Sequence, residues 1–187
     1  MRRLWRRECR GRLHIYPGGK VEYTAYIPLM RAIAEHGVFC ALVEMPLNLA
    51  FFDINAADKV IAEYTGIKTW YVGGHSLGGA VASIYLSSHY ESLSGLVLLA
   101  SYPSLDVSLI CNKAISIYGS ADGVLNRGNY SEASKFLPPT VREVVIDGGN
   151  HAGFGMYGEQ EGDGEATITA GEQILLTAEY VTEFINV

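Results

Sequence analysis

Short, continuously apolar runs alternate along this chain with longer segments in which apolar residues recur every three or four positions. The short runs are rich in Val, Ile and Leu, which is typical of strands covered on both faces of a parallel sheet. Six such runs are expected to form strands: Leu13–Tyr16, Val38–Val43, Thr69–Gly73, Gly95–Leu99, Ala114–Tyr118 and Val141–Ile146.

The longer segments have the periodicity of helices that cover one face of a core. Helices are expected over Tyr26–His36, Asn55–Tyr64, Leu77–His89 and Asn129–Phe136, and from Thr169 along an apolar stripe that reaches Ile185. The last helix has a readable start, because Thr169 and Glu172 have the spacing of a capping box.

Strand–helix alternation of this kind predicts the α/β class: a three-layer sandwich of about six mostly parallel strands with helices on both faces. The chain shows neither internal repeats nor a linker, so residues 13–187 are expected to form a single domain. The interval between Leu99 and Ala114 is too short for a helical lid domain.

Residues 1–12 differ from the rest of the chain, because they contain six arginines and one acidic residue. The remainder holds eight basic and nineteen acidic residues, a net charge of −11 against −6 for the whole chain, so nucleic acid is not an expected partner. The arginine-rich segment is interpreted in three ways: a poorly ordered terminus, a start that does not reflect the full natural domain, or an arm that binds anionic lipid or nucleic acid.

Hydropathy and cysteine usage indicate in which cellular compartment the protein is expected. No apolar run reaches about 18 residues, so stable membrane insertion is not expected, and no apolar segment of a secretory signal follows the basic start. The chain has three cysteines, Cys9, Cys40 and Cys111. An odd number without the spacing of metal ligands favours a protein whose thiols are reduced, in the cytoplasm.

One glycine-rich segment has the pattern of a nucleophile elbow. Residues 74–78 read Gly-His-Ser-Leu-Gly and match G-x-S-x-G between an expected strand and an expected helix. The segment fits neither the phosphate-loop motif nor the dinucleotide-binding motif. By itself it leaves two interpretations, a reactive Ser76 or an inert serine in a tight turn.

The partners of a reactive serine are a general base and a carboxylate that orients it. Asp122 and His151 each follow an expected strand, in the chain order that accompanies this elbow. We therefore predict a catalytic triad of Ser76, Asp122 and His151. The alternatives are that Asp122 is only a turn residue and that Asp106, after the preceding strand, supplies the acid.

An oxyanion hole requires two N–H donors. The N–H of Leu77, directly after the serine, is expected to be one. The other is expected from the loop after the first strand, where Gly19 is favoured over its neighbour Lys20. A glycine turn without function is the alternative for this loop.

Two further features are expected to be structural. His75 is expected to pack beside the nucleophile without a catalytic role. Acidic residues alternate with small ones in a late segment, but its twelfth position is Ala170 instead of the glutamate of a calcium-binding EF-hand loop. Neither a metal nor a cofactor is predicted, and this loop is expected to position His151 and to form a pocket wall with Phe154, Met156 or Tyr157.

Taken together, several segments resemble the α/β-hydrolase superfamily: "YPGGKVE", "GGHSLGGA", "LVLLASYP", "SIYGSADGV", "GGNHAGFG" and "GEQEGDGEATIT". The resemblance runs from about Leu13 to the C-terminus and is to the compact, lidless group called α/β-hydrolase fold-5 or dienelactone-hydrolase-like. Dienelactone hydrolases carry a cysteine nucleophile, so Ser76 points to an esterase.

The resemblance also implies a shortened sheet. The superfamily's sheet usually has about eight strands, and the first strand of this chain corresponds to the third of them. About six parallel strands are therefore expected, in the order 4-3-5-6-7-8 by the superfamily's numbering. A homodimer that protects the exposed apolar side of an edge strand, or its covering helices, is a hypothesis that follows.

The predicted function is that of a serine hydrolase acting on small carboxylic esters through an acyl-enzyme intermediate. Thioester or amide hydrolysis would use the same residues and remains an alternative. A non-catalytic binding protein on a truncated hydrolase fold is the alternative from a different class.

Overall fold

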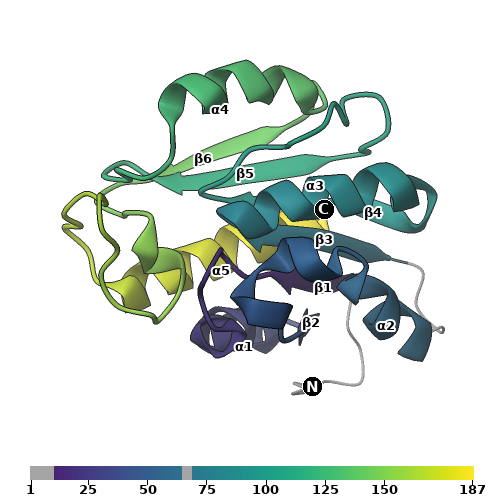
Figure 1. The fold of residues 1–187 in the computed structure, drawn as a ribbon, viewed down its shortest axis with the longest axis horizontal. Coiled ribbons are helices and arrows are strands. Elements are labelled where there is room, and N and C mark those ends of the chain that lie inside the picture. The colour runs from purple at the N-terminus through teal and green to yellow at the C-terminus, as the bar shows by residue number, and fades with distance from the viewer. Residues whose placement is uncertain (1–10, 65–68) are drawn as a thin grey trace.

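The computed structural model describes residues 11–64 and 69–187. Within these ranges, six parallel strands form one sheet in the order β2-β1-β3-β4-β5-β6 (Figure 1). The strands are β1 (Gly11–Tyr16), β2 (Val38–Leu42), β3 (Trp70–His75), β4 (Leu93–Leu99), β5 (Ala114–Gly119) and β6 (Arg142–Ile146). Each lies within two residues of its predicted bounds, and the order is the one expected from the superfamily, so the predicted sheet is confirmed.

Helices cover both faces of this sheet, as predicted. They are α1 (Ile27–Glu35), α2 (Ala56–Glu63), α3 (Leu77–His89), α4 (Arg127–Ala133) and α5 (Ala170–Asn186). Helices α1 and α5 pack together on one face, and α2, α3 and α4 lie on the other (Figure 1).

The predicted capping box at the start of α5 is present. The Thr169 hydroxyl accepts from the Glu172 N–H at 3.2 Å, and the Glu172 carboxylate accepts from the Thr169 N–H at 2.8 Å. The apolar face that follows is buried against the core, including Ile174, Val181 and Ile185. The sequence pattern therefore predicted both the start of this helix and the face that packs.

Strand β1 begins two residues earlier than predicted and includes Arg12, although the sequence pattern places Arg12 in the basic terminal segment. The Arg12 side chain is buried, and its guanidinium lies 5.3 to 5.5 Å from the ring centroids of Phe39, Tyr64 and Trp70. It also donates to the Tyr64 carbonyl at 2.6 Å. Aromatic faces and a carbonyl acceptor compensate for the buried charge, which is why an arginine fits in this strand. The rest of the arginine-rich segment, residues 1–10, lies outside the described residues.

Parallel pairing brings the carboxyl ends of all the strands to one edge of the sheet. The loops after β1, β3, β5 and β6, which carry the predicted functional residues, therefore converge at this edge. In the two described ranges, no helix is long and apolar enough to cross a membrane.

Candidate active site

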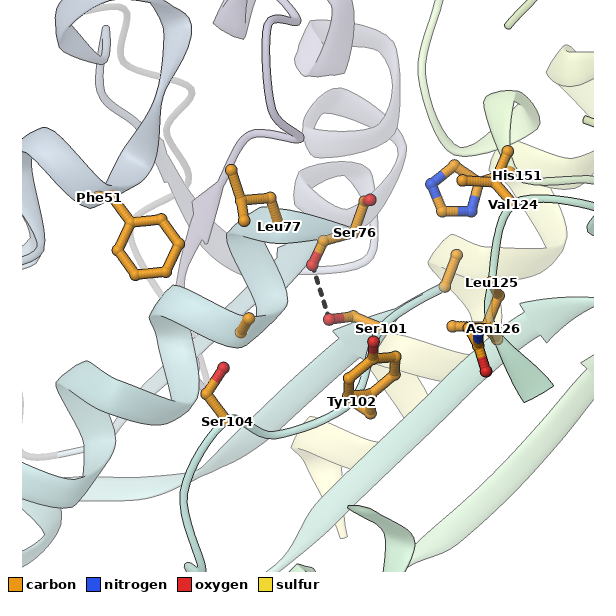
Figure 2. A pocket seen from close by; sticks show the side chains of 12 residues that line it. Phe51, Ser76, Leu77, Ser101, Tyr102, Ser104, Val124, Leu125, Asn126 and His151 are labelled. Carbon is orange, nitrogen blue, oxygen red and sulfur yellow. Dashed lines mark hydrogen bonds between the residues drawn. The ribbon is translucent and has the colours of Figure 1, made fainter. Parts of the chain in front are cut away.

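Ser76 occupies the sharp turn between β3 and α3. Its backbone has φ 52° and ψ −122°, a conformation that residues other than glycine adopt rarely and at an energetic cost. The Ser76 N–H donates to the Leu99 carbonyl at 2.9 Å, and its own carbonyl accepts from the Ser101 hydroxyl at 2.6 Å (Figure 2). These bonds hold the strained turn against the end of β4, as expected for a nucleophile elbow.

The two glycines of the motif are required by the packing of this turn. A Cβ on Gly74 would lie 2.2 Å from the carbonyl carbon of Gly78. A Cβ on Gly78 would lie 2.2 Å from the Tyr16 carbonyl oxygen. Side chains do not approach backbone atoms this closely, so the turn that presents Ser76 needs glycine at both positions.

Asp122 and His151 are brought together by the loops after β5 and β6. The His151 Nδ1 lies 3.0 Å from Asp122 Oδ2 and 3.2 Å from Oδ1, and both side chains are buried. Burial by itself would raise the pKa of Asp122, but hydrogen bonds from His151 and from the N–H groups of Leu125 and Val124 outweigh it and hold the pKa below 3.8. Asp122 is therefore an ionised carboxylate, and because a carboxylate can only accept, His151 donates the hydrogen bond from Nδ1–H.

His151 is held at every polar atom except one. Its N–H donates to Asp163 Oδ1 at 3.1 Å, its carbonyl accepts from His75 Nε2 at 3.1 Å, and its Nδ1 bonds to Asp122. Its Nε2 is buried and has no hydrogen-bond partner in the described part of the chain.

The structure gives no hydrogen bond between Ser76 and His151, but both side chains face the same pocket (Figure 2). Such catalytic hydrogen bonds are often long in a ligand-free enzyme. The structure thus joins Asp122 to His151 and places Ser76 beside them.

The loop after β1 lies against the start of α3. Its Gly18 N–H donates to the Tyr26 hydroxyl at 3.0 Å, and the Lys20 N–H donates to the Asn48 carbonyl at 2.8 Å. The Gly19 N–H between them has no hydrogen bond within the described residues. A Cβ on Gly19 would lie 2.9 Å from Leu77 Cδ2, so the two residues are close neighbours. The Leu77 N–H, at the first position of α3, has no acceptor within its helix.

Asp163 ties together the two loops that carry the acid and the histidine. Its Oδ1 accepts from the N–H groups of Gly123, His151 and Gly164 at 2.9 to 3.1 Å, and its Oδ2 accepts from Ala152 at 2.8 Å. The sequence identified this acidic loop as one that positions His151, but not the residue that does so. A lone Asp between two glycines is a weak signal for a carboxylate that binds backbone N–H groups.

A cavity of about 360 Å³ opens beside Ser76 and His151. Apolar and small polar side chains complete its walls: Phe51, Leu77, Ala80, Ala100, Ser101, Tyr102, Ser104, Val124, Leu125 and Asn126 (Figure 2). None of these described lining residues is Asp, Glu, Lys or Arg. The predicted wall of Phe154, Met156 or Tyr157 is wrong, because Phe154 is buried in the core and the other two line a separate hollow.

The alternative acid, Asp106, has a different environment. It is exposed, and its Oδ1 accepts from the N–H and hydroxyl of Ser108 at 3.0 and 2.7 Å. These hydrogen bonds lower the pKa of Asp106. Asp106 therefore caps a local turn, while Asp122 contacts His151.

In residues 11–64 and 69–187, no three His, Cys, Asp or Glu side chains are grouped as metal ligands.

Comparison with known proteins agrees with this architecture. The model of the alpha/beta hydrolase family matches residues 12–175. No curated protein matches the chain significantly.

Solved structures of similar fold include the esterase domain of a Rhodothermus marinus protein, with TM-score 0.71 and 13% identity over 96% of this chain and 88% of that one. Est1E from Butyrivibrio proteoclasticus with bound ferulic acid has TM-score 0.70 and 14% identity, covering 95% of this chain and 89% of its own. Dienelactone hydrolase from Anabaena variabilis has TM-score 0.68 and 16% identity, covering 95% and 88%. At these identities the likeness is one of fold. Because the family model spans most of the sequence and the fold agrees with it, the chain belongs to the alpha/beta hydrolase family.

Proposed function

We propose that this hydrolase cleaves carboxylic esters with Ser76 as nucleophile, His151 as general base and Asp122 as its orienting carboxylate. The observation that carries the proposal is the state of His151. Its backbone and Nδ1 are all bonded, and only Nε2 is left without a partner, beside the pocket that Ser76 lines. A general base needs that atom free to take the serine proton.

The reaction then follows in two halves. The Ser76 oxygen attacks the ester carbonyl carbon as its proton moves to His151 Nε2, and the N–H groups of Leu77 and Gly19 bind the oxyanion. The bond to the alcohol oxygen breaks, and His151 returns the proton to that oxygen. A water molecule attacks the acyl-enzyme in the same way, which releases the carboxylic acid and restores the serine. Asp122 keeps the imidazole in the Nδ1–H tautomer and stabilises its cation.

The pocket supports an uncharged substrate. No Asp, Glu, Lys or Arg is among its described lining residues, and much of the wall is apolar. The strongly acidic body repels polyanionic substrates, which favours esters over acyl-coenzyme A thioesters. Small soluble esters remain the expected class, and the ferulic acid bound by Est1E adds aromatic esters to the panel worth testing.

The proposal also includes the cellular location and the partners of the protein. The buried thiol of Cys111, which forms no disulfide within the described residues, supports a reduced, cytoplasmic location. A homodimer, and the lack of a nucleic-acid partner, stay predictions.

The direct test is Ser76→Ala. We expect kcat for p-nitrophenyl acetate to fall by about 10⁴-fold or more, because the nucleophile is removed. Ser87→Ala is the control and is expected to keep wild-type activity. It removes a hydroxyl on the same helix, whose one hydrogen bond among the described residues goes to the Ile84 carbonyl at 2.7 Å. Unchanged turnover in the Ser76 variant would refute the assignment.

Labelling separates the alternative classes. A fluorophosphonate probe is expected to modify Ser76, as read by peptide mass spectrometry. A folded protein that resists the probe would favour a non-catalytic binding role. A matched panel of ester, thioester and amide substrates then ranks the bond types by kcat/KM.

A further inference from the structure

A buried hydrogen-bonded chain runs behind the proposed catalytic groups. The Gly18 N–H bonds to the Tyr26 hydroxyl at 3.0 Å, and this hydroxyl bonds to His75 Nδ1 at 2.7 Å. The other ring nitrogen of His75, Nε2, bonds to the His151 carbonyl at 3.1 Å. Tyr26, His75 and His151 are each at most 1% exposed.

The chemistry of the acceptors fixes the direction of every bond in this chain. A carbonyl oxygen only accepts, so His75 must carry its proton on Nε2 and donate it to His151. In the neutral ring Nδ1 is then an acceptor, and Tyr26 donates to it while accepting from Gly18. Burial, and to a lesser extent the neighbouring His151, lowers the pKa of His75 to about 3, so the ring is neutral at ordinary pH.

This row of hydrogen bonds connects three segments whose relative positions must be fixed for the reaction. Gly18 precedes Gly19, the proposed oxyanion donor. His75 precedes Ser76 in the elbow. The His75 and His151 rings also lie 4.6 Å apart between centroids, so the two side chains pack directly.

We propose that Tyr26 and His75 are positioning residues that hold the oxyanion loop and the catalytic histidine at their working distance from Ser76. The proposal rests on the ester-hydrolase function proposed above. Neither side chain lines the pocket, so each acts through Gly18 and His151 rather than on the substrate. Displacement of a reacting group by about 1 Å costs up to about 100-fold in rate, which sets the size of effect that such residues control.

The test begins with Tyr26→Phe, which keeps the ring and removes the hydroxyl. We expect kcat for p-nitrophenyl acetate to fall about 10- to 100-fold while KM changes less than about twofold, because the pocket walls are untouched. Tyr157→Phe is the matched control. Its ring lies 6.5 Å from that of Tyr26, but its hydroxyl bonds to Gln160, and it is expected to keep wild-type kcat.

A second pair of variants tests His75 without Tyr26. In His75→Gln the amide N–H can still donate to the His151 carbonyl, whereas in His75→Leu nothing can. We expect the Gln variant to retain at least about tenfold more kcat than the Leu variant. Equal values in two folded variants would overturn the positioning role of His75.

A spectroscopic measurement makes the test independent of activity and of variant folding. Nitrogen-15 NMR of the wild-type histidines is expected to show His75 as the neutral Nε2–H tautomer. A proton on Nδ1, or a folded Tyr26→Phe variant with wild-type kcat, would overturn the proposal. Failure of the ester-hydrolase function is seen separately, as activity that survives Ser76→Ala.

Discussion

At the scale of single residues, the site is defined by which polar atoms already have a hydrogen-bond partner and which do not. The N–H groups of Gly18 and Lys20 are bonded, whereas the N–H of Gly19, the proposed oxyanion donor, has no acceptor within the described residues. The same holds for His151, because Nε2 is the one polar atom of this residue that has no partner within the described residues. A buried polar atom left unpaired costs free energy, and such atoms are expected where a substrate or transition state will complete the bonding.

Phe51 gives the residue-scale prediction. It lines the pocket while remaining 47% exposed, whereas its neighbour Phe52 is 61% exposed and does not line the pocket. We expect Phe51→Ala to lower selectivity for larger apolar esters over acetate by about fivefold, because covering part of a phenylalanine ring is worth about 1 kcal/mol.

The measurement compares kcat/KM across two series of esters, one extended on the acyl side and one on the alcohol side. Phe52→Ala is the matched control and is expected to leave both series unchanged. If Phe51→Ala also leaves both unchanged, this wall does not contact the substrate.

At the scale of elements, loops that are distant in sequence are joined by one carboxylate. Asp122 follows β5 and His151 follows β6, and Asp163, in the long connection to α5, bonds to backbone N–H groups in both loops. Because the strands are parallel, these loops already lie at one edge of the sheet. Asp163 then fixes their relative position.

The substitution Asp163→Asn tests whether these hydrogen bonds hold the two loops together. The amide has one acceptor oxygen instead of two and no charge, so the four N–H bonds cannot all be kept. We expect the free energy of unfolding to fall by about 1 to 3 kcal/mol in urea titrations, with a parallel loss of kcat. Asp147→Asn is the control, since within the described residues that carboxylate accepts a single exposed hydrogen bond, from the Ser120 hydroxyl at 3.2 Å. A loss of stability in Asp147→Asn as large as that in Asp163→Asn would contradict the special role of Asp163.

At the scale of the whole molecule, two fully buried histidines make the fold sensitive to acid. Burial lowers the pKa of His14 and of His75 from 6.5 to about 3. His14 lies in β1 against the Tyr16 ring, 4.6 Å between centroids, and neither of its ring nitrogens has a partner within the described residues. Between pH 6.5 and about 3 the unfolded chain binds protons at these sites and the folded chain does not.

The free energy of unfolding is therefore expected to be fully retained above pH 6.5 and to decrease as the pH falls through this window. Each histidine contributes a slope of up to about 1.4 kcal/mol per pH unit. Replacing His14 by Leu is expected to reduce the slope, as measured by urea unfolding at pH 5 and pH 7. An undiminished slope in the His14 variant would contradict the prediction.

The sequence by itself determined the order and type of the strands and helices, the capping box of α5 and the elbow around Ser76. These features depend on periodicity, on short motifs and on the handedness of strand–helix–strand connections, all of which are local or nearly so. It also predicted Asp122 and His151, because the carboxyl ends of parallel strands meet at one edge.

Only the tertiary structure decided which polar side chains form contacts and which residues are their partners. Arg12 is buried among aromatic rings, Asp106 turns to Ser108, and Tyr26 reaches His75 across 49 positions of sequence. His75 in turn reaches the carbonyl of His151 across 76 positions. Hydrogen bonds of this range depend on how the loops pack above the sheet, and no local pattern along the chain encodes that packing.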